Sequence, residues 1–300
     1  MFGMRPVRFR PWSALALATS LLLHSLAVTA ETVDWTVWPL PGVVNVVNDK
    51  PTDGITMEAM ALLMERLPDL QPQYRIANRL RQQKMMADGE NVCSIPLFQR
   101  EDSDKFAYFI PFMITTPIQA IIRRDDLERF PLEDGFLSLA RLLDETDLHG
   151  GQSGFRTYPD PLGAWLAEAV AKKRVKNITG SQGGENLQLM VSHGRLDYIF
   201  EFSSISMAMR KGSHMREPLL ALPILEDRNL VESGIYCTRN AWGQRMAERL
   251  DRAIRELVAE PEALLQLYVN GMPLETYLVF EQDIRNYYQE RAARVLSFRD

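Results

Sequence analysis

Strand-like and helix-like segments alternate through the whole chain after residue 30, and this order constrains the fold more than any other feature. Asp53 is expected to cap the first helix, because its carboxylate can accept from the free amides of the first turn. Apolar residues recur in that helix at intervals of three and four and so share one face: Met60, Leu63, Met64 and Leu67. The first block of elements is predicted to hold strands at 35–38, 73–77 and 92–98 and helices at 53–67 and 80–87.

A second block of the same kind follows. Asp160-Pro161 opens its first helix, since proline fits the first helical turn and the aspartate accepts free amides there. Extended stretches flank the block at 117–124, 219–225 and 230–238, and the C-terminal part is helical. The predicted strands lie at 148–152, 175–178 and 196–200, and the predicted helices begin near 160 and span 184–192, 242–259, 261–269 and 282–296.

This order of elements predicts an α/β protein of two α/β lobes joined by two extended hinge segments. Lobe 1 is expected to comprise residues 31–118 and 230–300, and lobe 2 residues 125–224. The hinge segments are expected at 119–124 and 225–229.

The N-terminus has the three parts of a secretory signal peptide. Arg5, Arg8 and Arg10 precede an apolar run without charge at 12–28, and the small residues of Val28-Thr29-Ala30 follow it. We expect cleavage after Ala30, with an uncleaved anchor as the alternative. In either case residues 31–300 would lie outside the cytoplasm.

The exported chain would be acidic. All 39 acidic residues lie after Ala30, whereas three of the 34 basic residues lie before it, so the formal net charge falls to about −8. Such a surface repels nucleic acid, and no basic patch opposes this. Metal binding is not expected, because His149, His193 and His214 lack partners at zinc-site spacing. No cofactor is expected.

The exported chain contains two cysteines, Cys93 and Cys237. An even number of cysteines in an oxidising compartment is compatible with a disulfide, and two buried free thiols are the alternative. The count alone does not decide between them.

Three passages together resemble the family 3 extracellular solute-binding proteins, in which two lobes close over a small ligand. Residues 48–54, Asn-Asp-Lys-Pro-Thr-Asp-Gly, are similar to the turn before the family's first helix. Residues 94–101 and 108–112 resemble its strand, Thr-Pro-Glu-Arg turn and Phe-Ser-x-Pro-Tyr segment. Residues 194–201, Gly-Arg-Leu-Asp-Tyr-Ile-Phe-Glu, resemble its Gly-Arg-x-Asp-Ala-Val strand with an acid at the far end. The resemblance implies a periplasmic binding protein-like fold of type II.

The chain also departs from the family's pattern. Phe98-Gln99 replaces the Thr-Pro-Glu lead-in, and the acid Glu201 lies one place early and is one methylene longer. These differences leave the fold prediction intact but do not favour an ordinary α-amino acid as the ligand.

The resemblance implies that Arg100 holds a ligand carboxylate. A guanidinium presents two parallel donors and stays charged when water is excluded. The alternative is a surface arginine that balances the acids at 101–104. In lobe 2, Ser153 and Gly154 precede a helix, where unpaired amides and the helix dipole favour an anion, and Arg156 would add a second cation. A solvated turn capped by Ser153 is the alternative.

Three further residues are expected at the ligand. Glu201 would pair with a ligand ammonium, unless it is a surface acid paired with Arg195 or Arg210. Trp38 and Phe98 end strands of the first lobe, where open α/β sheets place their ligands, so they are expected to cover the apolar part of a small ligand. Their alternative role is core packing.

We therefore expect a monomeric periplasmic protein that binds a small polar, carboxylate-bearing, amino-acid-like solute for a membrane transporter or a sensor. The alternative is an enzyme on the same scaffold that resembles the cyclohexadienyl dehydratases, with Glu201 as general acid. In the topology that the resemblance implies, the returning strand brings Cys237 beside Cys93, which favours a disulfide.

Overall fold

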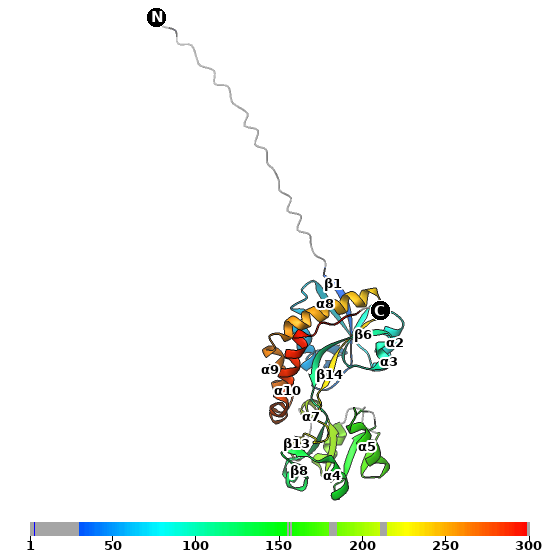
Figure 1. The fold of residues 1–300 in the computed structure, drawn as a ribbon, viewed down its shortest axis with the longest axis vertical. Helices are drawn as coiled ribbons and strands as arrows, with labels where there is room; N and C mark the ends of the chain where they lie inside the picture. Colours follow the sequence, from blue (N-terminus) through cyan, green and yellow to red (C-terminus); the bar gives the residue numbers. More distant parts are fainter. Residues whose placement is uncertain are drawn as a thin grey trace.

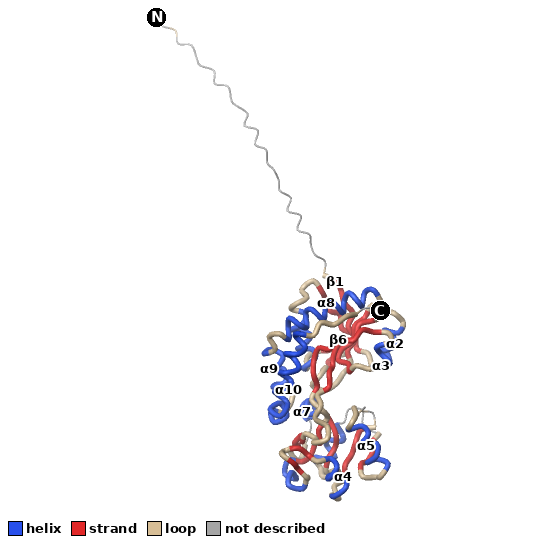
Figure 2. Tube along the Cα trace, in the orientation of Figure 1, coloured by secondary structure: helices blue, strands red, loops and turns tan. Residues whose placement is uncertain are grey.

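A computed structural model describes Gly3 and residues 30–298 except 155, 157, 180–184 and 211–214. The chain forms two bodies, which lie one above the other in Figure 1. Apart from Gly3 and Ala30, the predicted signal peptide lies outside the described residues, as does the predicted helix start near 184. Each body holds a central sheet with helices around it (Figure 2). We call the upper body lobe 1 and the lower body lobe 2. None of the described helices is long and apolar enough to cross a membrane.

Lobe 1 is built on a five-stranded mixed sheet. Its strand order is β4 (Leu70–Ile76), β1 (Glu31–Val37), β5 (Val92–Phe98), β14 (Val231–Thr238) and β6 (Ala107–Thr115). The first three strands run parallel, so their carboxyl ends share one edge, while β14 is antiparallel to β5 and β6. A short hairpin joins β2 (Val46–Val47) to β3 (Lys50–Pro51).

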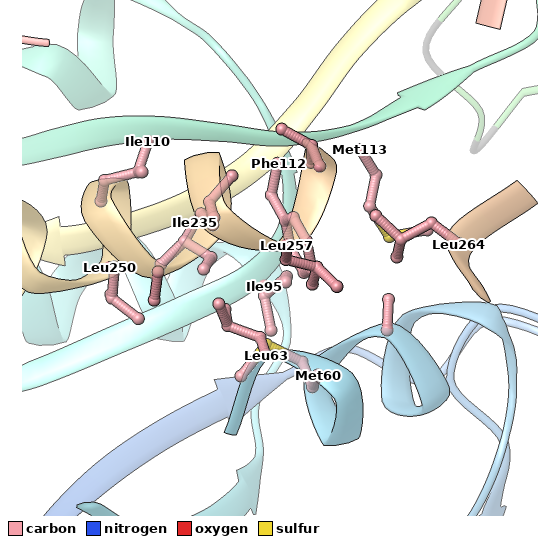
Figure 3. Close-up of a cluster of buried hydrophobic side chains, with 14 of the residues drawn as sticks. Met60, Leu63, Ile95, Ile110, Phe112, Met113, Ile235, Leu250, Leu257 and Leu264 are labelled. Carbon is pink, nitrogen blue, oxygen red and sulfur yellow. The ribbon is translucent and has the colours of Figure 1, made fainter. Parts of the chain in front are cut away.

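Helices cover this sheet and complete the core of lobe 1. They are α1 (Ile55–Met64), α2 (Arg79–Ala87), α3 (Glu101–Asp104), α8 (Ala241–Val258), α9 (Glu262–Gly271) and α10 (Leu274–Ala293). Figure 3 shows Leu63 of α1 and Leu250 and Leu257 of α8 gathered with Ile110 of β6 and Ile235 of β14. All five side chains are buried, and their removal from water stabilises the lobe.

Strand β14 returns from lobe 2 and inserts between β5 and β6. Cys237 of β14 lies in register with Cys93 of β5, and the two form a disulfide. This confirms the predicted pairing. Gly234 is required in β14, because a Cβ there would lie 2.2 Å from the carbonyl oxygen of Ile110.

Lobe 2 has its own sheet, in the order β11 (Val175–Ile178), β10 (Gly150–Ser153), β12 (Tyr198–Glu201), β7 (Gln119–Arg123) and β13 (Leu219–Leu222). Strands β11, β10 and β12 are parallel, and β7 is antiparallel to β12 and β13. The remaining elements are a 3-10 helix (Arg124–Arg129), the hairpin β8 (Leu132–Glu133) and β9 (Phe136–Leu137), and helices α4 (Leu139–Glu145), α5 (Leu162–Ala171), α6 (Glu185–Ser192) and α7 (Ser203–Arg210).

The first hinge segment differs from the expectation. Residues 119–123 form β7 within the lobe 2 sheet, where Ala120, Ile121 and Ile122 are fully buried between β12 and β13. The extended, apolar sequence from which a hinge was predicted therefore forms a strand of the lobe 2 sheet. Between the two sheets the chain runs through 116–118 and 223–230.

Two helix starts also differ from the sequence analysis. Gly54 rather than Asp53 precedes α1, with a φ of 112° that an L-residue rarely adopts. A Cβ at this position would lie 2.6 Å from the carbonyl oxygen of Val43, so the close approach of the backbone requires glycine here. Helix α10 begins at Leu274, well before the expected residue 282, after Pro273.

Candidate functional site

A cavity of about 320 Å³ lies between the two lobes. The carboxyl ends of β1 and β5 bring Trp38 and Phe98 to it, and the end of β12 brings Phe202 from the other lobe. The carboxyl edges of the parallel strands of both sheets therefore supply the walls, as in other open α/β sheets. The cavity size suits a small organic molecule.

Arg100 lines this cavity. The residue follows β5 and precedes the short helix α3, and its guanidinium has no hydrogen-bond or ion-pair partner within the described part of the chain. The backbone amide of Arg100 donates to Oη of Tyr236 at 2.9 Å, and this hydroxyl donates to Oδ1 of Asp104 at 2.5 Å. Tyr236 is 1% exposed, and burial raises the pKa of its hydroxyl. A buried tyrosine thus fixes the backbone from which Arg100 projects.

Tyr236 gives a direct test of this support. We expect Tyr236→Phe to lower the free energy of unfolding by about 1 to 3 kcal/mol, because the Arg100 amide and Asp104 lose their partner. Affinity for a carboxylate ligand should fall several-fold. Isothermal titration calorimetry measures the second effect. Tyr198→Phe, which truncates an equally buried tyrosine in lobe 2, is the control and should leave affinity unchanged.

Arg79 is a functional candidate that the sequence analysis missed. It is the first residue of α2, directly after the Asn78 cap, and it lines the cavity on the same side as Arg100. Within the described residues its guanidinium also has no hydrogen-bond or ion-pair partner. Helices α2 and α3 are neighbours, since Nε2 of Gln83 donates to Oδ2 of Asp102 at 3.1 Å. Two unpaired cations therefore come from adjacent elements of lobe 1.

Arg156 also lines the cavity, but it is paired. Its Nη2 donates to Oε2 of Glu201 at 2.6 Å, and its guanidinium lies 5.9 Å from the ring centroid of Phe202. Glu201 is 2% exposed and is absent from the cavity lining, and its Oε1 accepts from the Phe202 amide at 2.7 Å. Burial raises the pKa of Glu201 against the opposing effect of Arg156. The partner of Glu201 is thus neither Arg195 nor Arg210.

The prediction of unpaired amides at Ser153 and Gly154 is wrong. The Ser153 amide donates to Oη of Tyr158 at 3.0 Å, and the Gly154 amide donates to the carbonyl oxygen of Ile178 at 2.9 Å. Strand β10 extends through Ser153, so these groups complete the sheet edge and its turn. Neither residue belongs to the cavity lining.

The two predicted aromatic residues do line the cavity. Trp38 is 39% exposed, and Phe98 lies with its ring centroid 6.3 Å from that of Phe202 across the lobes. The missed lining residues on the lobe 2 side come mainly from the start of α7, namely Ser204 and Ile205. Among the described residues no group of three or more His, Cys, Asp or Glu side chains has a metal-binding arrangement.

No model of a known protein family and no curated protein matches the chain by sequence. Solved structures match its fold. The probable amino-acid ABC transporter extracellular-binding protein of Bacillus subtilis superposes with a TM-score of 0.61 at 12% identity, over 81% of this chain and 97% of its own. A histidine kinase sensor domain with similarity to periplasmic binding proteins has a TM-score of 0.56 at 13% identity, over 82% and 99%.

The periplasmic VFT2 domain of BvgS from Bordetella pertussis is a third such structure, with a TM-score of 0.55 at 15% identity, over 80% of this chain and 93% of its own. At these identities the likeness establishes the fold. The chain therefore has the two-lobed α/β fold of periplasmic binding proteins, as the sequence analysis predicted.

Proposed function

We propose that this protein is a periplasmic solute-binding protein whose two lobes close over a small polar, carboxylate-bearing ligand. The observation that carries the proposal is the cavity between the lobes with the unpaired guanidinium of Arg100 in its wall. A guanidinium in a partly desolvated site binds a carboxylate through two charge-assisted hydrogen bonds. The apolar remainder of the wall would cover the rest of the ligand.

The N-terminal sequence supports the proposed location. The arginine-rich start, the apolar run and the small residues up to Ala30 are the features that signal peptidase recognises. Two structural neighbours are named as extracellular or periplasmic proteins. The partner in this proposal is a membrane transporter or a sensor, because neighbours of both kinds share the fold.

The alternative function, an acid-assisted elimination with Glu201 as general acid, needs a carboxylic acid that faces the ligand. The two carboxylate oxygens of Glu201 instead accept hydrogen bonds, one from Arg156 and the other from the Phe202 amide. This placement favours a structural role for Glu201 and binding over catalysis.

A thermal-shift panel of amino acids, carboxylates and polyamines tests the proposal. A ligand at a hundredfold excess over its Kd raises the free energy of unfolding by about 2.7 kcal/mol. For a protein of this size we expect the melting temperature to rise by about 5 to 10 °C. Arg100→Gln should lose most of the shift. If no member of the panel stabilises the protein, solute binding is not its function.

A further inference from the structure

The charged side chains around the cavity are all cationic within the described part of the chain. Arg79, Arg100 and Arg156 line it, and no aspartate or glutamate does. Among the described residues, Arg156 is the only one of the three that forms an ion pair, with Glu201 at 2.6 Å. Within the described residues Arg79 and Arg100 therefore form no ion pair, although the charge of Arg100 also acts on the carboxylate of Asp102.

Glu201 is not available to a ligand ammonium. One carboxylate oxygen accepts from the Phe202 amide and the other from Arg156, and the side chain is 3% exposed. An ammonium in this cavity would lose its hydration without gaining a carboxylate and would face the guanidinium groups of Arg79 and Arg100. The site as built disfavours an α-amino acid zwitterion.

The uncharged part of the wall is mainly apolar and aromatic. Trp38, Phe98 and Phe202 contribute rings from both lobes, and Met113 and Ile205 contribute aliphatic surface. Walls of this kind suit an apolar ligand body that offers a ring face or a hydrocarbon chain. The polar residues of the wall include Thr56 and Ser204, whose side chains carry hydroxyl groups and no charge.

From these observations we propose that the ligand is an organic acid with an apolar body, two carboxylates and no ammonium group. The inference rests on the proposed solute-binding function and names its ligand class. Arg79 and Arg100 each bind one carboxylate. Arg79 begins α2 and Arg100 directly precedes α3, and these neighbouring elements suit two acidic groups at one end of the molecule.

Four probes of similar size separate the contributions of charge: phenylsuccinate, 3-phenylpropionate, L-phenylalanine and 2-phenylethylamine. Calorimetric titration should give the tightest binding for phenylsuccinate. We expect 3-phenylpropionate to bind at least about 10-fold more tightly than L-phenylalanine, which differs from it only by the ammonium group, and 2-phenylethylamine not to bind.

Each outcome bears on a distinct claim. If L-phenylalanine binds as tightly as 3-phenylpropionate, the exclusion of ammonium ligands is overturned, while solute binding stands. Equal affinity for phenylsuccinate and 3-phenylpropionate overturns the assignment of two carboxylates. If none of the four probes binds, the ligand identified in the thermal-shift panel tests the proposal instead. An acid without an ammonium group supports the proposal, and an amino acid or a polyamine overturns it. Failure of the broader panel as well is failure of the proposed function itself.

A matched pair of variants tests Arg79. Arg79→Gln should weaken phenylsuccinate binding about 10- to 100-fold and remove its advantage over 3-phenylpropionate. Arg81→Gln removes the same charge two residues further along α2, from an exposed position outside the cavity, and should change both affinities less than about threefold. If the two variants behave alike, Arg79 does not bind the ligand. Melting temperatures of both variants confirm that they remain folded.

Discussion

Removal of the disulfide should lower the free energy of unfolding by about 3 to 4 kcal/mol, one of the two largest changes that we expect from a small substitution. The bond joins Cys93 and Cys237 across 144 residues, so it restricts the unfolded chain strongly. In the native sheet it links β5 to the strand that returns from lobe 2. For the double variant Cys93→Ala/Cys237→Ala we expect the melting temperature to fall by about 10 °C.

Urea unfolding of three proteins isolates this effect: the unsubstituted chain, Cys93→Ala and the double variant. The single and double substitutions should cost nearly the same, because either one opens the loop. The unsubstituted chain unfolded with a reductant is the matched control, since it loses the cross-link without losing a side chain. A double variant within 1 kcal/mol of the unsubstituted chain would contradict the prediction. So would two free thiols in the mass spectrum of unreduced protein.

The elements that were predicted well from the sequence are those in which the apolar residues of the local pattern are also the residues buried in the structure. Residues 92–98 form a nearly continuous apolar run and become β5 with the same bounds. The face of α1 that Met60 and Leu63 define is the face that packs into the core. In such segments the periodicity of the sequence directly reflects contact with the sheet.

Strand β6 was missed because its pattern conflicts with its place in the fold. Pro111 lies in the middle of the strand, and proline cannot donate to a ladder of hydrogen bonds. The strand tolerates it at the edge of the sheet, opposite Gly234, where the pairing register shifts. That compensation comes from a residue more than a hundred positions away, which no local pattern reveals.

The residues of the cavity also include some that a local sequence rule predicted and some that it missed. The rule that ligands lie at the carboxyl ends of strands directed attention to Trp38 and Phe98, and the family resemblance directed it to Arg100; all three line the cavity. Applied equally to β4, it would also have singled out Arg79, which starts the next helix. Applied to β12, the rule would likewise have directed attention to the start of α7, but no helix was predicted there, because Ser203-Ser204 has the polar character of a loop.

Pairing of charges was the least predictable feature. Glu201 was expected to meet a ligand ammonium or one of two basic residues near it in sequence or fold. It instead pairs with Arg156, which follows a neighbouring strand of the same sheet. A sequence shows which charges are present but not which two converge, since a shift of a few ångströms exchanges one partner for another.

The Arg156–Glu201 pair leads to the second large prediction: Arg156→Gln should lower the free energy of unfolding by about 3 kcal/mol at pH 7. The buried carboxylate of Glu201 would lose its counter-ion, and breaking such a pair leaves an uncompensated charge. The loss should depend on pH. Burial already raises the pKa of Glu201, and loss of the nearby cation raises it further.

The direction of this pH dependence follows from proton linkage. With a pKa higher in the folded than in the unfolded state, the folded protein binds more protons between the two values, so its stability falls as pH rises through that range. Because the variant has the higher of the two raised pKa values, its deficit relative to the unsubstituted protein should be largest at pH 7 and shrink as pH falls toward 5, by up to about 1.4 kcal/mol for each pH unit between the two folded-state pKa values. Urea unfolding at pH 5, 6 and 7 measures this trend.

Arg195→Gln is the matched control, because it removes the same charge from an exposed position in lobe 2. It should change stability by less than about 0.5 kcal/mol at every pH. A deficit of Arg156→Gln that stays constant from pH 5 to 7 would show that lost packing, rather than an uncompensated Glu201, causes the destabilisation. A deficit that instead grows as pH falls would mean that the pKa of Glu201 is lower in the folded variant than in the folded unsubstituted protein, which contradicts the expected effect of losing the nearby cation.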